Sequence, residues 1–307
     1  SIYPQHEIDK EVEVICDEID SYRDSPAELI FDEFEAMLYA GHPLGRDILG
    51  TPERLRQYTT ADAVRFAQRH YRPENAVFFV YGDVDFNTVT HTLERQFTLV
   101  DEWPESHRSF SDETAGMPAQ STEQEEPLRI VEKDTHQAHV LIGGTTFGGA
   151  DNRRFALMLL NNMLGGPGGN SRLNMSLREK AGLVYSADAY LSTYPDTGYW
   201  NVYFGCDAHD ISRCRRIVER ELRRFIDTPL SPAQLAAAKK QLCGQVGISC
   251  DSREGYALAM GKVFAHYNVH RNVQELLDSI RSITAAELQE TAAEVYCPDR
   301  LRTLIYR

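Results

Sequence analysis

The stretch TAAELQETAAEVYCPDRLRTLIY, residues 284–306, has the pattern of a helix that begins at threonine, a Tyr-x-Pro turn with an acidic residue, and an apolar strand. The same order of features occurs in TADAVRFAQRHYRPENAVFFVY, residues 60–81. Tyr71 matches Tyr296 at an offset of 225 residues, and the prolines that follow match at the same offset. A single match has little weight, since proline is common after a helix. Because the agreement runs through helix, turn and strand in order, it predicts a duplicated domain.

A polar segment divides the chain into two parts. Residues 102–127 contain proline and serine and almost no aliphatic side chains, which is typical of a linker. A chain of 307 residues is also long enough for two domains. Residues 1–101 are then predicted to be the C-terminal half of a first domain, and residues 128–307 a second, homologous domain. On this interpretation the front half of the first domain precedes Ser1.

Apolar periodicity predicts the elements of both parts. Before the linker it indicates helices at 7–23, 26–40 and 60–70 and a strand at 76–84. After the linker it indicates strands at 138–147, 183–192, 198–206 and 301–307, helices at 151–164 and 171–181, and three further helices before the last strand. Capping boxes mark helix starts at Ser231 and Thr284. The predicted fold is two α+β domains, each an antiparallel sheet with helices mainly on one face, and the first domain incomplete.

Composition excludes several classes of protein. The net charge of −14, from 32 basic and 46 acidic residues, argues against a nucleic-acid partner. No apolar run is long enough to span a membrane. The six cysteines are scattered without a CxxC pair, which indicates reduced thiols in a reducing compartment. Together with the lack of a visible signal sequence, this predicts a cytoplasmic location.

Two acids stand out in DKEVEVICDEIDSY, residues 9–22. Glu11 and Glu18 are seven residues apart and therefore lie on one face of the predicted helix. Apolar residues flank them on both sides, with Ile15 in the main stripe and Val14 opposite. Glutamate is rarely buried unless a positive group meets it. From these residues alone, acids paired with Lys or Arg at the edge of an apolar stripe are the favoured interpretation.

Longer runs carry a resemblance to a known family. In the first part they are KEVEVICDEI, SPAELIFDEF, GHPLGRDILGTPERL and YRPENAVFFVYGDVD; in the second they are DTHQAHVLIGGTTF, LMLLNNMLGGPGGNSRLNMSLREKAGLVYS and DTGYWNVYFGC. In this order the chain resembles the pitrilysin-like zinc peptidases, or inverzincins, in the branch that includes mitochondrial processing peptidase. The resemblance implies a zinc metalloendopeptidase for peptides or small unfolded proteins. It also implies two homologous domains per subunit and a second subunit, in a homo- or heterodimer.

The resemblance also implies roles for the two acids. The family's H-x-x-E-H helix supplies two zinc-binding histidines and a glutamate base. Matched residue by residue, Glu18 corresponds to the distal zinc ligand and Glu11 to a carboxylate that supports it. The ten histidines of this chain contain no H-x-x-E-H spacing, and the family would place that motif upstream of Ser1. Zinc is therefore expected in the full-length protein, whereas this chain alone is expected to lack zinc and activity.

A second signature of the family lies in LREKAGLVYS, residues 177–186. Arg178 and Tyr185 match an Arg and a Tyr that hold the substrate backbone near the scissile bond. Arg178 lies near the end of a helix that stops at Gly182, and Tyr185 opens the next strand, so both side chains can face one cleft. The guanidinium can donate to a peptide carbonyl, and the phenol can stabilise an oxyanion. Taken alone, the two residues would be a surface ion pair and a strand tyrosine.

Two other functions remain open at this stage. The first is a catalytically silent partner that binds peptide or scaffolds an active subunit, which the upstream sequence would distinguish. The second is nucleotide binding at the glycine-rich turn 165–170, which lacks the Lys-Ser/Thr of a Walker motif and is better interpreted as a flexible turn. His136 and His139 are three residues apart on a strand and point to opposite faces, so a core or edge role is favoured over chelation.

Overall fold

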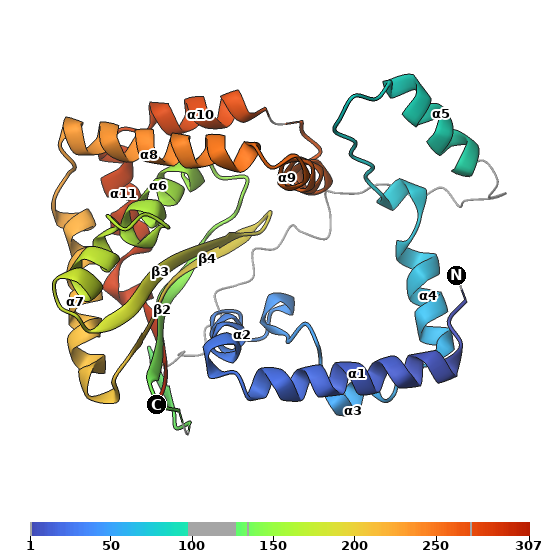
Figure 1. Cartoon of the computed structure of the whole chain (residues 1–307), viewed down its shortest axis with the longest axis horizontal. Coiled ribbons are helices and arrows are strands. Elements are labelled where there is room, and N and C mark those ends of the chain that lie inside the picture. The colour runs from blue at the N-terminus through green and yellow to red at the C-terminus, as the bar shows by residue number, and fades with distance from the viewer. Residues whose placement is uncertain (1, 98–126, 134, 271) are drawn as a thin grey trace.

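The computed structural model describes residues 2–97, 127–133, 135–270 and 272–307 (Figure 1). Apart from residue 127, the predicted linker 102–127 lies outside the described residues. The first part of the chain forms α1 (Gln5–Arg23), α2 (Pro26–Leu38), α3 (Pro52–Leu55), α4 (Thr60–His70) and α5 (Phe86–Phe97). The second part forms β1 (Leu128–Val131), β2 (Ala138–Phe147), α6 (Arg154–Gly165), a π-helical turn (Asn174–Glu179), β3 (Val184–Thr193), β4 (Thr197–Cys206), α7 (Ile211–Asp227), α8 (Pro232–Cys250), α9 (Arg253–Tyr267), α10 (Val273–Ser282), α11 (Ala285–Val295) and β5 (Arg302–Tyr306). Within these residues no helix is long and apolar enough to cross a bilayer.

The strands of the second part form one five-stranded sheet in the order β1-β5-β2-β4-β3. β2 lies antiparallel to both β4 and β5, and β3 lies antiparallel to β4. β1 runs parallel to β5, so the sheet is mixed rather than wholly antiparallel. The sequence gives no sign of β1, because its four residues are too few to show an alternating pattern. The mixed α+β architecture is otherwise as predicted.

The main core lies between this sheet and the helices of the second part. Trp200 and Phe204 of β4 are fully buried there beside Phe225 of α7 and Tyr296, which follows α11. Figure 1 shows α6, α7, α8, α10 and α11 on this side of the sheet. Burial of such large apolar side chains is the dominant favourable contribution to folding.

The opposite face of the sheet is covered in part by α2, from the first part of the chain. Ile30, Phe34 and Leu38 are buried against Leu141 of β2 and Leu304 of β5. Their spacing of four residues places them on one helix face. α1 packs beside α2, and its own buried side meets α3. The prediction of helices mainly on one face holds, and α2 is the exception.

The repeat seen in the sequence recurs as elements. α1 and α8 each have 19 residues, and α2 and α9 follow them after two residues. α4 and α11 follow in both parts, each closed by a tyrosine and a short 3-10 turn that begins at proline. Thr59 caps α4 through a capping box with Asp62, as Thr284 caps α11 with Glu287. The structural counterpart of Thr284 is therefore Thr59 rather than Thr60.

The predicted strand at 76–84 is wrong within the described residues. No neighbouring strand is described beside it, and an extended segment becomes a strand only through a hydrogen-bonded ladder. Tyr81 instead contacts Tyr256 of α9, with ring centroids 4.8 Å apart, and Phe79 lies beside Gly261 of the same helix. Leu304 and Tyr306, 225 residues later, pack on α2 in the same way. α2 thus covers β5 of the second copy, and α9 covers the corresponding extended segment of the first copy.

The predicted number of closing helices is also wrong. α7 to α11 make five helices in the described residues, where the sequence indicates three. Only Asp251 and Ser252 separate α8 from α9, and Ser252 accepts a hydrogen bond from Gly255 N at 3.1 Å as the new N-cap. Such a short break leaves little trace in apolar periodicity. Capping boxes at Ser231 and Thr284 are both confirmed.

Candidate functional site

Arg178 and Tyr185 lie on either side of a sharp reversal between the π-helical turn and β3. Gly182 N donates to Arg178 O at 3.0 Å, and Leu183 N donates to Leu177 O at 3.0 Å. Gly182 has a φ of +62°, in the left-handed region that favours glycine. The predicted helix end at Gly182 is therefore confirmed, and the chain enters β3 directly after it.

Tyr185 lies at a break in the strand register. β3 and β4 are in register at Val184 and again from Ala187, with a bulge between them. Bulges redirect side chains and are frequent beside active sites. Tyr185 is 87% exposed, and the Arg178 guanidinium lies 5.7 Å from its ring centroid. The structure therefore brings together the two residues that the sequence singled out.

The chemistry open to this pair follows from its exposure. Among the described residues, the only acid beside Arg178 is Glu179, at a loose 3.8 Å. A guanidinium has five N–H donors, so most of them remain available to a ligand. The Tyr185 hydroxyl can donate or accept a hydrogen bond. An exposed guanidinium beside a phenol can hydrogen-bond to the carbonyl groups of an extended peptide.

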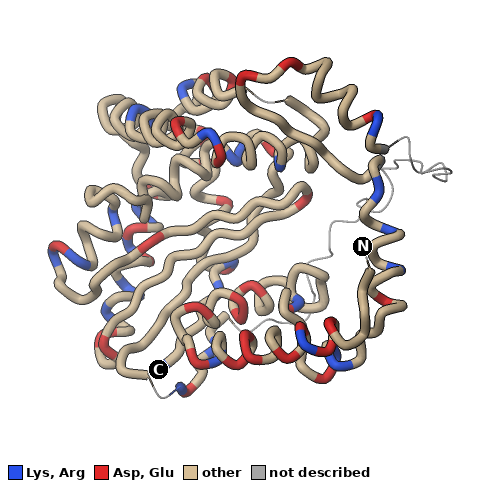
Figure 2. Tube along the Cα trace, turned by 45° about the vertical axis from the view of Figure 1, so that its right-hand side comes forward, with Lys and Arg blue, Asp and Glu red and all other residues tan. Residues whose placement is uncertain are grey.

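Glu11 and Glu18 both lie on the exposed surface of α1, while Val12 and Cys16 face its buried side. Acidic residues recur along this helix in Figure 2. Neither Glu11 nor Glu18 has a hydrogen bond or ion pair with any residue that the structure describes. Their neighbour Glu13, in contrast, meets Arg56 at 3.4 Å. The interpretation of the two acids as members of Lys or Arg pairs is therefore wrong within the described residues.

The repeat indicates which element the face that carries Glu11 and Glu18 would contact. Since α1 begins at Gln5 and α8 at Pro232, Glu18 corresponds to Gln245. Gln245 accepts a hydrogen bond from Asn162 of α6, so α8 uses this position to contact the helix beside it. In α1 the corresponding position carries a carboxylate instead of an amide. No described residue forms a hydrogen bond or ion pair with this carboxylate.

Side-chain hydrogen bonds join the glycine-rich turn 165–170 to α8. Asn170 Nδ2 donates to Gln241 Oε1 at 3.1 Å, and Gln241 Nε2 donates to Asn170 Oδ1 at 3.3 Å. A Cβ at Gly168 would lie 2.7 Å from Gln241 Nε2, so a larger residue there would require this side chain to move. The turn is therefore a packed connection to α8.

His139 has the core role that the sequence favoured. It is buried, and its Nδ1 lies 2.8 Å from the Tyr203 hydroxyl. Burial lowers the pKa of His139 because it disfavours the charged ring. All six cysteines are free thiols, as predicted.

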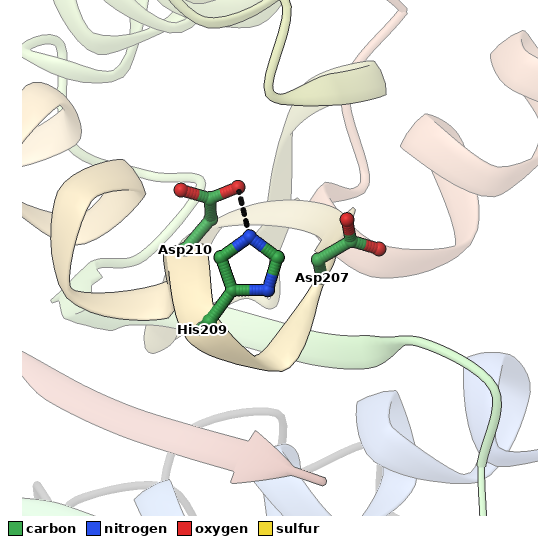
Figure 3. A group of neighbouring side chains, drawn as sticks. All are labelled: Asp207, His209 and Asp210. Atoms are coloured by element: carbon green, nitrogen blue, oxygen red, sulfur yellow. Dashed lines mark ion pairs between the residues drawn. The ribbon is translucent and has the colours of Figure 1, made fainter.

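One cluster of potential metal ligands escaped the sequence reasoning. Asp207, His209 and Asp210 lie at the start of α7, with their ligand atoms within 4.8 Å of one another (Figure 3). Its sequence signal is the short run DAHD, residues 207–210. His209 Nε2 lies 3.3 Å from Asp210 Oδ2, and the histidine is largely exposed. Acids are frequent at helix starts, where free N–H groups favour negative charge.

Comparisons with known proteins agree with this fold. The chain is 28% identical over 300 residues to a Streptomyces coelicolor protein named as an uncharacterized zinc protease, which covers 96% of this chain and 64% of that protein. A Bacillus subtilis protein named in the same way is 26% identical over 305 residues, covering 99% and 72% of the two chains. A protease structure from Helicobacter pylori matches with a TM-score of 0.86 at 18% identity, over 99% of this chain and 72% of that one.

The chain thus spans about two thirds of the length of these relatives. Residues 57–242, more than half of the chain, match the family model described as the peptidase M16 inactive domain. That range contains the β3 bulge, Arg178 and Tyr185. The chain therefore belongs to the family described as the peptidase M16 inactive domain.

Proposed function

We propose that the full-length protein is a zinc-dependent endopeptidase that cleaves peptides or small unfolded proteins. In this proposal Glu18 is one of the zinc ligands, and Glu11 supports it. Arg178 and Tyr185 hold the substrate backbone. Two relatives that match nearly the whole chain are named as uncharacterized zinc proteases, which supports the metal and the reaction class.

The observation that carries the proposal is the unpaired state of Glu11 and Glu18. Two carboxylates on one helix face without a basic partner are free to meet a cation. No Lys or Arg in the described part of the chain forms an ion pair with Glu11 or Glu18. The equivalent position in α8, Gln245, contacts the neighbouring helix α6. A carboxylate at the same place in α1 would face the counterpart of α6, which is where a metal-binding helix is expected.

The residues present fit part of a zinc site. A catalytic zinc needs three protein ligands and an open position, and Glu18 would supply one oxygen ligand. Two histidine ligands and a base would come from the H-x-x-E-H helix expected outside this chain. Bound zinc would supply a Lewis acid and an activated water.

The other roles fall to further residues of this chain. Arg178 would donate to a substrate carbonyl and fix the register of the peptide. The Tyr185 hydroxyl would donate to the oxygen that gains charge as the peptide bond is attacked. Glu11 would keep the Glu18 carboxylate oriented.

A catalytically silent subunit is the second candidate. Its support is that the matching family model is described as an inactive domain. Such a protein would retain Arg178 and Tyr185 for peptide binding and act beside an active partner. A second subunit is part of both proposals.

The experiment is to purify the full-length protein, dialyse it, and measure zinc by atomic absorption and cleavage of a quenched fluorogenic peptide. The proposal predicts one zinc per chain and cleavage that a chelator abolishes and added zinc restores. Binding of the peptide without zinc or cleavage would instead support the silent subunit. A full-length protein that neither retains zinc nor binds the peptide would contradict both candidates.

A further inference from the structure

A carboxylate on α2 joins the first part of the chain to the β3–β4 hairpin. Glu35 Oε1 accepts a hydrogen bond from the Tyr194 hydroxyl at 2.6 Å, and Glu35 Oε2 accepts one from the Tyr199 hydroxyl at 3.1 Å. Tyr194 lies in the turn between the two strands, and Tyr199 lies in β4. These bonds connect residues 159 and 164 positions apart in the sequence. Hydrogen bonds to a charged acceptor are stronger than neutral ones.

Aromatic side chains surround this contact. Tyr39, at the end of α2, is buried with its hydroxyl 3.3 Å from Thr197 Oγ1. Phe31 packs edge to face on Tyr190 of β3, with ring centroids 5.4 Å apart. Burial raises the pKa of the Tyr194 hydroxyl, so this group remains protonated and able to donate at neutral pH. Glu35 thus has two fixed donors at the edge of an apolar contact.

The position of α1 depends on this contact through α2. Only Asp24 and Ser25 separate α1 from α2, and α1 packs mainly against α2 and α3. α2, in turn, lies directly on β2 and β5. Whatever fixes α2 on the sheet therefore also fixes the face of α1 that carries Glu11 and Glu18.

We infer that Glu35 is a positioning residue that, through Tyr194 and Tyr199, sets the face carrying Glu11 and Glu18 against the part of the chain that carries Arg178 and Tyr185. This inference rests on the proposed function, in which both pairs act on one peptide. Groups that act together must be held to a fraction of an ångström, since a misplacement of about 1 Å can cost roughly a hundredfold in rate.

The anchor itself can be tested on the 307-residue chain by hydrogen exchange. The variant Tyr194→Phe/Tyr199→Phe removes both donors without a cavity, and Tyr190→Phe is the matched control because no hydrogen bond of its hydroxyl to a described residue is found. We expect amides of α1 and α2 to exchange roughly tenfold faster in the double variant, from the usual worth of such bonds. Helices α7 and α11, in the main core on the other face of the sheet, should keep the wild-type rate. Wild-type protection of α1 and α2 would overturn the anchor.

A second pair of variants tests whether Glu35 is the partner of these tyrosines. Glu35→Gln should loosen α1 and α2 in the same region, whereas Glu28→Gln, an exposed acid of the same helix, should not. Adding Glu35→Gln to the double tyrosine variant should cause little further change, because the same bonds are already lost. Fully additive effects would overturn the assignment of Glu35 as their acceptor.

The positioning role needs the full-length protein and its peptidase assay. Tyr194→Phe/Tyr199→Phe should lower kcat by roughly ten- to a hundredfold, with zinc content unchanged and KM little affected. A kcat equal to wild type despite faster exchange would overturn the positioning role alone. A wild-type protein without zinc-dependent cleavage would overturn the proposed function and this role with it, while the exchange rates would still decide the anchor.

Discussion

Tyr185 combines two features that rarely occur together, a large aromatic ring and 87% exposure. It lies beside the bulge before Ala187, and its partner Arg178 is brought near by the reversal at Gly182. The sequence predicted the helix end and the start of the strand, because glycine after a helix is a clear stop signal. It did not predict the bulge, since a register shift depends on the partner strand β4. The pair was predictable; its exposure was not.

Removing the Tyr185 hydroxyl should affect the reaction more than binding. In the active full-length protein, Tyr185→Phe should lower kcat by up to the roughly 10²- to 10³-fold typical of losing one oxyanion donor, with KM little changed. Steady-state kinetics on a fluorogenic peptide measures both constants. Tyr190→Phe, on the same strand, is the matched control, and a melting curve should show that both variants fold. Unchanged kinetics in Tyr185→Phe would show that the Tyr185 hydroxyl has no role in the reaction.

For Glu11 and Glu18 on α1, the shared face was predictable and the surroundings were not. Helical spacing predicted that Glu11 and Glu18 share a side, and the structure agrees. Their lack of basic partners was not predictable, because it depends on where distant Lys and Arg residues lie. Glu13 shows this clearly, since its partner Arg56 is 43 residues away.

At the scale of elements, local signals predicted most of the second part. β2 has the predicted bounds, because a run rich in strand-forming residues is bracketed by clear breaks. α5 and β1 were missed, and the segment 76–84 was predicted as a strand but is not paired in the described residues. The segment 76–84 lacks a partner strand among the described residues, and β1 is too short to show a pattern. α5 does have a local start signal, because the Asp85 carboxylate accepts a hydrogen bond from Thr88 N at 2.7 Å.

The reversal between the π-helical turn and β3 can be tested through Gly182. A Cβ at this position meets nothing within 4 Å, so the cost of Gly182→Ala is the backbone strain of a positive φ. We expect the free energy of unfolding to fall by about 1–2 kcal/mol, measured by urea denaturation. Gly244→Ala in α8 is the control of opposite sign, because a Cβ there is equally free and alanine favours a helix by about 1 kcal/mol. A neutral Gly182→Ala would show that the reversal does not need glycine.

At the scale of the whole molecule, the duplication explains the arrangement best. α2 of the first copy covers β5, and α9 of the second copy lies on Phe79 and Tyr81, which correspond to Leu304 and Tyr306 of β5. The sequence predicted the repeat from a helix, a turn and a strand. It did not predict the exchange of helices between the copies, because contacts between parts leave no periodic signal. The division into domains at residues 102–127 remains a prediction.

The 307-residue chain alone should bind zinc weakly and cleave no peptide. Glu18 supplies one ligand, whereas a catalytic zinc site needs three from the protein. After dialysis, atomic absorption should therefore find far less than one zinc per chain. Tight stoichiometric zinc would reveal another site, and Asp207→Asn with His209→Gln would test whether the cluster at the start of α7 holds it.

The most direct test of the central claim is the zinc affinity of the full-length protein with Glu18→Gln. Glu13→Gln, on another side of α1, is the matched control. The account predicts that Glu18→Gln loses stoichiometric zinc and peptidase activity, that Glu11→Gln loses roughly 10- to 100-fold in zinc affinity, and that Glu13→Gln binds zinc as wild type does. Full zinc content and wild-type cleavage in Glu18→Gln would contradict the account.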